Sequence, residues 1–171
     1  MTGEMRHLAQ LNVGRMLAPV DSPAIAGFRA QLDPINALAD ADPGLVWRLQ
    51  TEAGNATDIR PTDDDLFLIN LSVWRSIEAL RAFTYTTGHV HVLRDRRRWF
   101  ERLTEAHLVL WWVPVGHIPS IAEALDRLEL LRRDGPTPAA FTFRAPFAPE
   151  ADGPGDALVD AEFCWPEPMR P

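Results

Sequence analysis

The chain has 171 residues, 46% hydrophobic and 24% charged, which is the size and composition of one globular domain and excludes wholesale disorder. Its formal net charge of −7 argues against general nucleic-acid binding, and its single cysteine, Cys164, excludes an internal disulfide. No apolar run reaches the roughly 18 residues of a membrane span, and no signal peptide is recognisable, so we expect a cytoplasmic protein without a membrane partner.

The first part of the chain combines strand and helix patterns. Residues 7–13 alternate in polarity and predict a strand, and the Ser22-Pro23 pair is typical of a helix start. Apolar residues then continue at helical spacing, and Pro34 inside this pattern predicts a kink or a break, because proline lacks an amide donor. Residues 45–50 alternate again and predict a second strand.

The middle of the chain begins with a predicted loop over residues 51–65, which are rich in Gly, Asn, Thr, Pro and Asp. Residues 66–74 form the clearest strand pattern, and a helix pattern follows it directly. We expect a further helix over about residues 89–103 and another strong strand over residues 106–115.

The last part begins with the capping-box pattern Ser120-Ile-Ala-Glu123, in which serine and glutamate satisfy each other's backbone amides at a helix start. Gly135 ends this helix, and residues 140–143 predict a short final strand. We divide the chain into a domain over residues 1–149 and a proline-rich irregular tail over residues 150–171.

The order β-α-β-β-α-(α)-β-α predicts an α+β fold, a ferredoxin-like β-α-β-β-α-β unit with extra helices and an antiparallel sheet. In this topology the strands at residues 7–13 and 66–74 are central neighbours, and helices cover one face of the sheet. The other face must also be covered, usually by a second copy of the sheet. We therefore expect a homodimer that forms a dimeric α/β barrel.

Three stretches are more specific than this order of elements. They are residues 74–85 (WRSIEALRAFTY, followed by His89), residues 97–100 (RRWF) and residues 110–117 (LWWVPVGH). They resemble the DUF3291 family over roughly residues 7–147. The resemblance implies a dimeric α/β barrel related in fold to antibiotic-biosynthesis monooxygenases and to haem-binding proteins.

Strand alternation places a polar set on one face of the two central strands. Gln10 and Asn12 come from the first strand, and Asn70, Ser72 and Trp74 come from the third. We expect this set on the barrel side, away from the helices. It is either a structural hydrogen-bond network or a set that orients a bound substrate.

Tyr85 and His89 are four residues apart and flank Gly88, so on a helix they would share a face. They are candidate catalytic residues, a proton donor and a base. The alternative is a cap and a loop hydrogen bond. His89 and His91 also have a metal-ligand spacing, but no carboxylate or cysteine lies close in sequence, so we predict no metal.

All 17 basic residues are arginine, and four of them, Arg94, Arg96, Arg97 and Arg98, form a cluster in this acidic chain. A solvated helix face explains such a cluster. The alternative is one arginine turned inward to hold a carboxylate or enolate, and we name Arg98 as the substrate-binding candidate.

Trp111 and Trp112 are adjacent in a strand and must point to opposite faces, with His107 on the side of Trp111. We name Trp111 and His107 as substrate-binding candidates, because a tryptophan in a barrel can stack on an aromatic compound. Trp111 could equally be dimer core. Given the fold relatives, His89 or His107 could bind a haem iron.

The expected function is a small cofactor-independent enzyme, monooxygenase-like or isomerase-like. It would oxygenate an aromatic or polyketide-like small molecule, or move a proton in it during isomerisation or cyclisation. A non-catalytic small-molecule-binding or structural dimer is the first alternative, and a haem-binding protein is the second. The sequence carries no dinucleotide-binding, phosphate-loop or serine-hydrolase pattern.

Overall fold

The computed structural model describes residues 5–86 and 95–149, and its centre is a four-stranded antiparallel sheet in the order β2-β3-β1-β4. The central strands are β1 (Arg6–Arg15) and β3 (Phe67–Trp74), and the edge strands are β2 (Leu45–Arg48) and β4 (Leu108–Pro114). This confirms the predicted ferredoxin-like α+β fold, with the first and third strands as neighbours.

The helical elements follow the predicted order. They are η1 (Pro23–Ile25), α1 (Ala26–Ala41), α2 (Ile77–Thr86), η2 (Arg96–Arg98) and α4 (Ile121–Asp134). The Oγ atom of Ser22 accepts a hydrogen bond from the Ala24 amide at 3.3 Å, which caps the start of η1 as the sequence predicts. None of the described helices has the length and apolar composition needed to cross a membrane.

Two helix predictions need correction. α1 continues through Pro34, so a break there is wrong, because the neighbouring Leu32 and Ile35 are both partly buried against the sheet side of the helix. The helix expected over residues 89–103 does not extend past η2, and residues 87–94 lie outside the described part. After η2 the chain instead runs beside β1, where the Glu101 amide donates to the Arg15 carbonyl at 2.8 Å.

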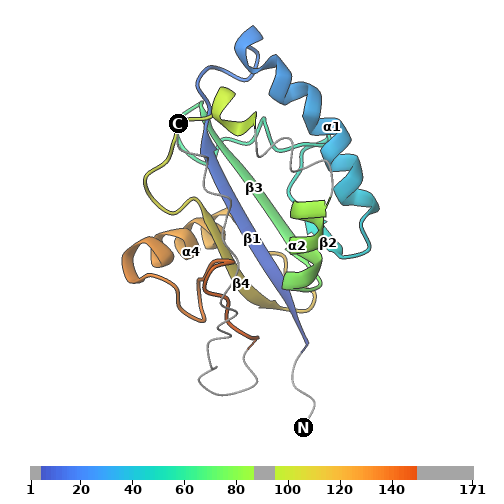
Figure 1. Ribbon diagram of the computed structural model, residues 1–171, viewed down its shortest axis with the longest axis vertical. Helices are drawn as coiled ribbons and strands as arrows, with labels where there is room; N and C mark the ends of the chain where they lie inside the picture. Colours follow the sequence, from blue (N-terminus) through green and yellow to red (C-terminus); the bar gives the residue numbers. More distant parts are fainter. Residues whose placement is uncertain (1–4, 87–94, 150–171) are drawn as a thin grey trace.

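The face of the sheet formed by odd-numbered strand residues packs against α4 (Figure 1). Leu128 and Leu131 of α4 lie in one buried cluster with Leu11, Leu71 and Trp111 of the strands. This is the face that the sequence left to the helices. A second copy of the sheet was expected on the opposite face, which α1 and α2 of the same chain cover. The argument for a homodimer loses that basis, and self-association stays a prediction.

The face formed by even-numbered strand residues lies beneath α1 and α2 (Figure 1), which corrects the expectation that it points away from the helices. Towards β4 the chain after α4 completes the cover. Phe141 exchanges two backbone hydrogen bonds with Leu110, at 2.8 and 2.9 Å, and Trp112 donates from Nε1 to the Phe147 carbonyl at 2.8 Å. The predicted final strand at residues 140–143 is therefore reduced to isolated bridges.

The start of α4 forms only half of the predicted capping box. Ser120 Oγ accepts from the Glu123 amide at 3.1 Å, but the Glu123 carboxylate is engaged elsewhere. One of its oxygens accepts from Trp111 Nε1 at 3.1 Å and the other lies 2.8 Å from His117 Nε2. Glu123 thereby ties α4 to β4. Gly135, with φ of 74°, ends the helix as expected.

Candidate functional site

A cavity of about 230 Å³ lies between the even-numbered face of the sheet and the helices α1 and α2. A cavity of roughly 150 Å³ is enough to hold benzene, so this one has room for a larger ring compound. Its polar lining comprises Gln10, Asn12, Gln31, Asn36, Arg48, Asn55, Thr57, Asn70, Ser72, Thr84 and Arg96. The predicted polar strand residues therefore do come together, and they do so at a cavity.

Three residues of the polar set are linked by hydrogen bonds at the floor of the cavity. Gln10 is paired with Ser72 across β1 and β3, and Ser72 Oγ donates to Gln10 Oε1 at 2.8 Å. Trp74 Nε1 in turn donates to Ser72 Oγ at 2.9 Å. All three residues are buried, so these hydrogen bonds satisfy polar atoms that water does not reach.

Asn12 and Asn70 are the open part of the polar set. They face each other in the strand register, one step along from Gln10 and Ser72. Asn70 belongs to a central strand yet is exposed, and both residues line the cavity. Within the described residues neither side-chain amide forms a hydrogen bond, which leaves both amides available to a ligand.

Arg96 brings a positive charge to the cavity. Its Nη2 donates to the Val13 carbonyl at 3.2 Å, and its guanidinium lies 5.8 Å from the centre of the Phe100 ring. Burial lowers the pKa of Arg96, although an arginine keeps its charge in proteins. In the part of the chain that the structure describes, no carboxylate forms an ion pair with this guanidinium.

The close packing of this region depends on Gly14 at the end of β1. A Cβ atom added there would lie 2.9 Å from Cδ1 of Phe100, nearer than real Cβ contacts allow. The absence of a side chain at Gly14 therefore lets Phe100, and with it Arg96, approach the central strand.

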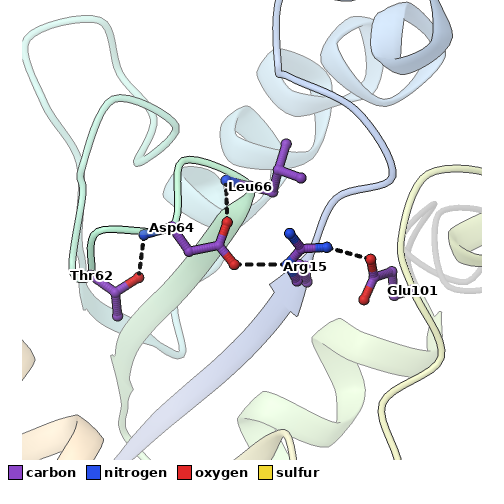
Figure 2. A network of polar contacts seen from close by, with 5 residues as sticks. All are labelled: Arg15, Thr62, Asp64, Leu66 and Glu101. Carbon is purple, nitrogen blue, oxygen red and sulfur yellow. Dashed lines mark hydrogen bonds and ion pairs between the residues drawn. The ribbon is translucent and has the colours of Figure 1, made fainter.

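A polar network beside β1 fixes the same region (Figure 2). Arg15 Nε donates to Asp64 Oδ2 at 2.7 Å, and Arg15 Nη1 also donates to Glu101. Asp64 accepts a further hydrogen bond from the Leu66 amide at 3.0 Å, and its own amide donates to Thr62 Oγ1 at 3.2 Å. The hydrogen bond from Arg15 lowers the pKa of Asp64. One arginine thus joins the loop before β3 and the segment after η2 to the end of β1.

Aromatic rings supply much of the remaining wall. Phe28 of α1 meets Phe100 edge to face with centroids 5.0 Å apart, and Trp74 lies tilted against Phe83 of α2, also at 5.0 Å. Phe143 lines the cavity from the segment after α4. Aromatic and other apolar walls that carry placed polar groups are typical of sites for small molecules.

The far rim of the cavity carries a second arginine, but its charge is compensated. Arg48 contacts the Asp40 carboxylate with two nitrogens, at 2.6 and 2.8 Å, which lowers the pKa of Asp40. Arg48 and Asn36 also both donate to the Gly54 carbonyl, at 2.9 and 3.3 Å. We therefore assign Arg48 to holding the rim loop, and Arg96 to meeting a ligand.

Three predicted substrate-binding residues lie outside the cavity lining. Arg98 has a side chain that is 74% exposed, and its nearest carboxylate is Asp95 at 3.9 Å, so Arg96 rather than Arg98 is the arginine at the cavity. Trp111 is buried under α4 and bonded to Glu123. His107 is partly buried, and this burial, with the nearby charge of Arg96, lowers its pKa.

Tyr85 lies behind the cavity wall. Its ring meets that of Phe143 at 6.5 Å, edge to face, and Phe143 is the one of the two that lines the cavity. Burial raises the pKa of Tyr85. The other catalytic candidate, His89, and the neighbouring His91 lie outside the described residues, so the proposed pair stays a prediction. Among residues 5–86 and 95–149 there is no cluster of three metal-ligating side chains.

Sequence reasoning missed the contribution of α1. Its residues at positions 28, 31, 32, 35 and 36 line the cavity, and their helical spacing was the available signal. That spacing predicts a buried stripe but does not distinguish a solid core from a cavity wall.

The model of the family described as a domain of unknown function (DUF3291) matches residues 7–155. No curated protein matches the sequence. Among solved structures, SnoaB, a cofactor-independent oxygenase from Streptomyces nogalater, is similar at 17% identity and a TM-score of 0.45, over 67% of this chain and 98% of that one. Rv0793 from Mycobacterium tuberculosis is similar at 16% identity and a TM-score of 0.44, over 67% and 99%. Neither likeness bears on the activity of this chain.

Proposed function

The chain belongs to the DUF3291 family, and on this premise we propose that it is an enzyme that binds a small acidic ring compound in the cavity and stabilises its anion. The observation that carries the proposal is Arg96, a partly buried arginine at the cavity with no carboxylate partner among the described residues. A charge in such a place is costly unless an opposite charge accompanies it. An anionic ligand supplies that charge.

The neutral amides around Arg96 support the same proposal. Asn12 and Asn70 each carry two N–H donors and have no described hydrogen bond of their own. Hydrogen bonds from fixed donors to an anionic oxygen are roughly twice as strong as those between neutral groups. Arg96 and the two asparagines would therefore favour an enolate, phenolate or carboxylate over the neutral compound.

Stabilising an anion links the cavity to the two reactions expected from the sequence. Proton transfer on a ring compound passes through an enolate or phenolate, and oxygenation without a cofactor begins by forming the same kind of anion. Donors arranged in advance around the developing charge lower the barrier to such a step. Simple binding without turnover is the competing function, and it needs no change in the compound.

Binding of para-nitrophenol tests the proposal, because its phenolate and its phenol absorb at different wavelengths. We expect bound para-nitrophenol to ionise at a pH lower by about one unit or more, as is typical near a positive charge. Arg96→Met should abolish the shift, and Arg98→Met, which changes an exposed arginine, should leave it unchanged. An equal shift in the Arg96→Met protein would disprove the proposed role of Arg96.

Turnover is measured separately, with a ring compound that carries an acidic C–H group. Exchange of that hydrogen for solvent deuterium, or uptake of oxygen, should be faster with the native protein than with Arg96→Met. Binding without exchange or oxygen uptake across a panel of such compounds would show a non-catalytic binding protein.

A further inference from the structure

The side-chain nitrogen of Gln10 is a hydrogen-bond donor that the protein leaves unused. Gln10 is 7% exposed and lines the cavity. Its Oε1 atom accepts from Ser72 Oγ at 2.8 Å, and within the described residues the side chain forms no other hydrogen bond. Nε2 is not among the unpartnered side-chain atoms that are fully enclosed, so it keeps some surface of its own. A water molecule or a ligand atom can therefore reach this donor.

The surface of Nε2 belongs to the cavity. Gln10 lies in the middle of a central strand, in register with Ser72 on β3 and with Leu110 on β4. Leu110, and Leu8 two residues back on the same face of β1, are both fully buried. These neighbours close the space around Gln10 within the sheet. The open direction is away from the sheet, where the cavity lies.

Two other side chains set the direction of the Gln10 amide. Trp74 Nε1 can only donate, and it donates to Ser72 Oγ at 2.9 Å. The Ser72 hydroxyl directs its own hydrogen at Gln10, whose amide can accept only through Oε1. The N–H groups of the amide must then point elsewhere. Aligned hydrogen bonds of this kind also polarise one another, which strengthens the donor at the end of the chain.

Gln10 and Arg96 lie at the two ends of a row of polar groups along β1. Even-numbered positions of the strand share the cavity face, and successive ones are about 7 Å apart. A Cβ atom at Gly14 would lie 3.5 Å from Nη2 of Arg96, so the cation stands at the level of Gly14. Asn12 lies between the two ends and also lines the cavity. A ligand lying along β1 therefore meets a positive charge at one end and a neutral donor at the other.

We propose that Gln10 Nε2 donates a hydrogen bond to a carbonyl oxygen of the ligand, across the ring from the anionic oxygen that Arg96 holds. The inference rests on the proposed function and narrows its substrate class to ring acids with a carbonyl group opposite the acidic group. Ser72 and Trp74 are then positioning residues, which act on the ligand through Gln10.

A carbonyl group matches this donor better than the other oxygen groups. A carbonyl oxygen accepts a hydrogen bond and brings no hydrogen of its own, whereas a hydroxyl group would need a further acceptor. A second anionic group would need a second free cation. Arg48, the other arginine in the lining, is already paired with Asp40 through two nitrogens.

The test compares para-acetylbenzoate with para-isopropylbenzoate, and the two meta isomers with each other. Both members of a pair have the same ring, carboxylate and branched shape, but only the acetyl compound has a carbonyl oxygen. Dissociation constants are measured by calorimetry. We expect the native protein to bind para-acetylbenzoate roughly 3- to 10-fold more tightly than para-isopropylbenzoate. The preference should be smaller in the meta pair, whose groups lie closer together, and a larger one there would contradict a carbonyl group across the ring.

In Gln10→Met the preference for the acetyl compound should disappear or reverse, while both compounds still bind through Arg96. Val113→Ala is the control for a loss of stability, because Val113 is buried under α4 on the other face of the sheet, outside the cavity lining. This control should keep the preference. A change in the ratio of two dissociation constants that is absent from Val113→Ala does not come from lower stability.

Two Ser72 variants test the orientation of the amide with Gln10 still in place, and they serve also if Gln10→Met does not fold. Ser72→Ala removes the hydrogen that fixes the amide and should weaken the preference towards none. Ser72→Thr retains a hydroxyl group and should keep most of it. A native preference in Ser72→Ala would show that Ser72 does not position Gln10.

Equal binding of the para pair to the native protein, or a preference that persists in folded Gln10→Met, would overturn the inference. Equal binding would mean that water or the Gln31 side chain, which also lines the cavity, takes up the donor. If binding of both compounds still depends on Arg96, the proposed function survives that failure. If neither compound binds, or Arg96→Met binds para-acetylbenzoate as tightly as the native protein, the proposed function and the inference fall together.

Discussion

The hydroxyl of Ser72 donates a hydrogen bond to Oε1 of Gln10, 2.8 Å away across the two central strands. The same hydroxyl oxygen accepts from Trp74 Nε1 at 2.9 Å. One small side chain thus satisfies a buried amide and a buried indole, at the floor of a cavity where the side-chain amides of Asn12 and Asn70 have no described hydrogen bond. The polar set expected from strand alternation divides into a structural half and an open half.

Ser72→Ala should destabilise the protein by about 1–3 kcal/mol, because it leaves the Gln10 carbonyl and the Trp74 indole without partners. Urea unfolding followed by far-UV circular dichroism measures this loss. Thr84→Val is a matched control, since the Thr84 hydroxyl is buried but bonds only to its own helix. If Ser72→Ala lowers the free energy of unfolding no more than Thr84→Val does, the hydrogen bonds of Ser72 to Gln10 and Trp74 do not stabilise the fold.

Asn70→Leu should give the opposite pattern. The Asn70 amide has no described partner, so its removal should leave the melting temperature close to that of the native protein. Binding of benzoate or para-nitrophenolate should weaken roughly 3- to 10-fold, through the loss of one hydrogen bond to an anion. Calorimetric titration of both proteins checks the effect. A large drop in melting temperature with unchanged binding would show that Asn70 stabilises the fold and does not contact the ligand.

Phe143→Ala should lengthen the cavity towards Tyr85. Phe143 is 5% exposed, and its loss should cost about 3–5 kcal/mol of stability, as for other buried phenylalanines. Compounds longer by one ring should then bind relatively better than single-ring compounds. Phe147→Ala is the control, because Phe147 packs on Phe141 outside the cavity lining. The same change in ligand length preference in both variants would contradict the role of Phe143 as an end wall.

Asp64→Asn should reduce stability in a pH-dependent way. The hydrogen bond from Arg15 lowers the pKa of the folded-state Asp64 carboxyl. Its stabilisation is therefore present above the unfolded-state pKa of about 4 and disappears as the pH falls through the lower, folded-state pKa. Urea unfolding should show the native protein more stable than the variant at neutral pH, with the difference vanishing in acid.

Asp63→Asn, which changes an exposed neighbour in the same loop, is the control for Asp64→Asn. The two substitutions remove the same charge from nearly the same place, but only one of them removes the contact with Arg15. A difference between native protein and Asp64→Asn that is the same at neutral and acid pH would rule out the ion pair as its source.

The sequence was sufficient to make the two central strands neighbours and to place the polar residues on one face. A split β-α-β order makes β1 and β3 neighbours, and alternation along each strand places Gln10, Asn12, Asn70 and Ser72 on the same face. The register that pairs Gln10 with Ser72 and Asn12 with Asn70 came from the structure. Both inferences depend on local spacing, which the chain carries in its own sequence. Capping at Ser22 and Ser120 was predictable for the same reason.

The contacts between distant elements were not predictable in this way. The apolar stripes of α1 and α2 do not say which face of the sheet they cover, so these two helices lie where a partner sheet was expected. The four arginines at residues 94–98 look alike in sequence, and a helix was expected around them. A short 3-10 turn at Arg96–Arg98, with Phe100 packed on Gly14, instead brings Arg96 to the cavity and leaves Arg98 in solvent.

The two hydrogen bonds between Leu110 and Phe141 have an effect on how the protein meets other molecules. β4 is an edge strand, and an open strand edge is a template on which another chain can add a strand and begin to aggregate. Because Phe141 occupies the outer amide and carbonyl of Leu110, the middle of this edge is closed to such an addition. The segment that walls the cavity also protects the sheet from intermolecular growth.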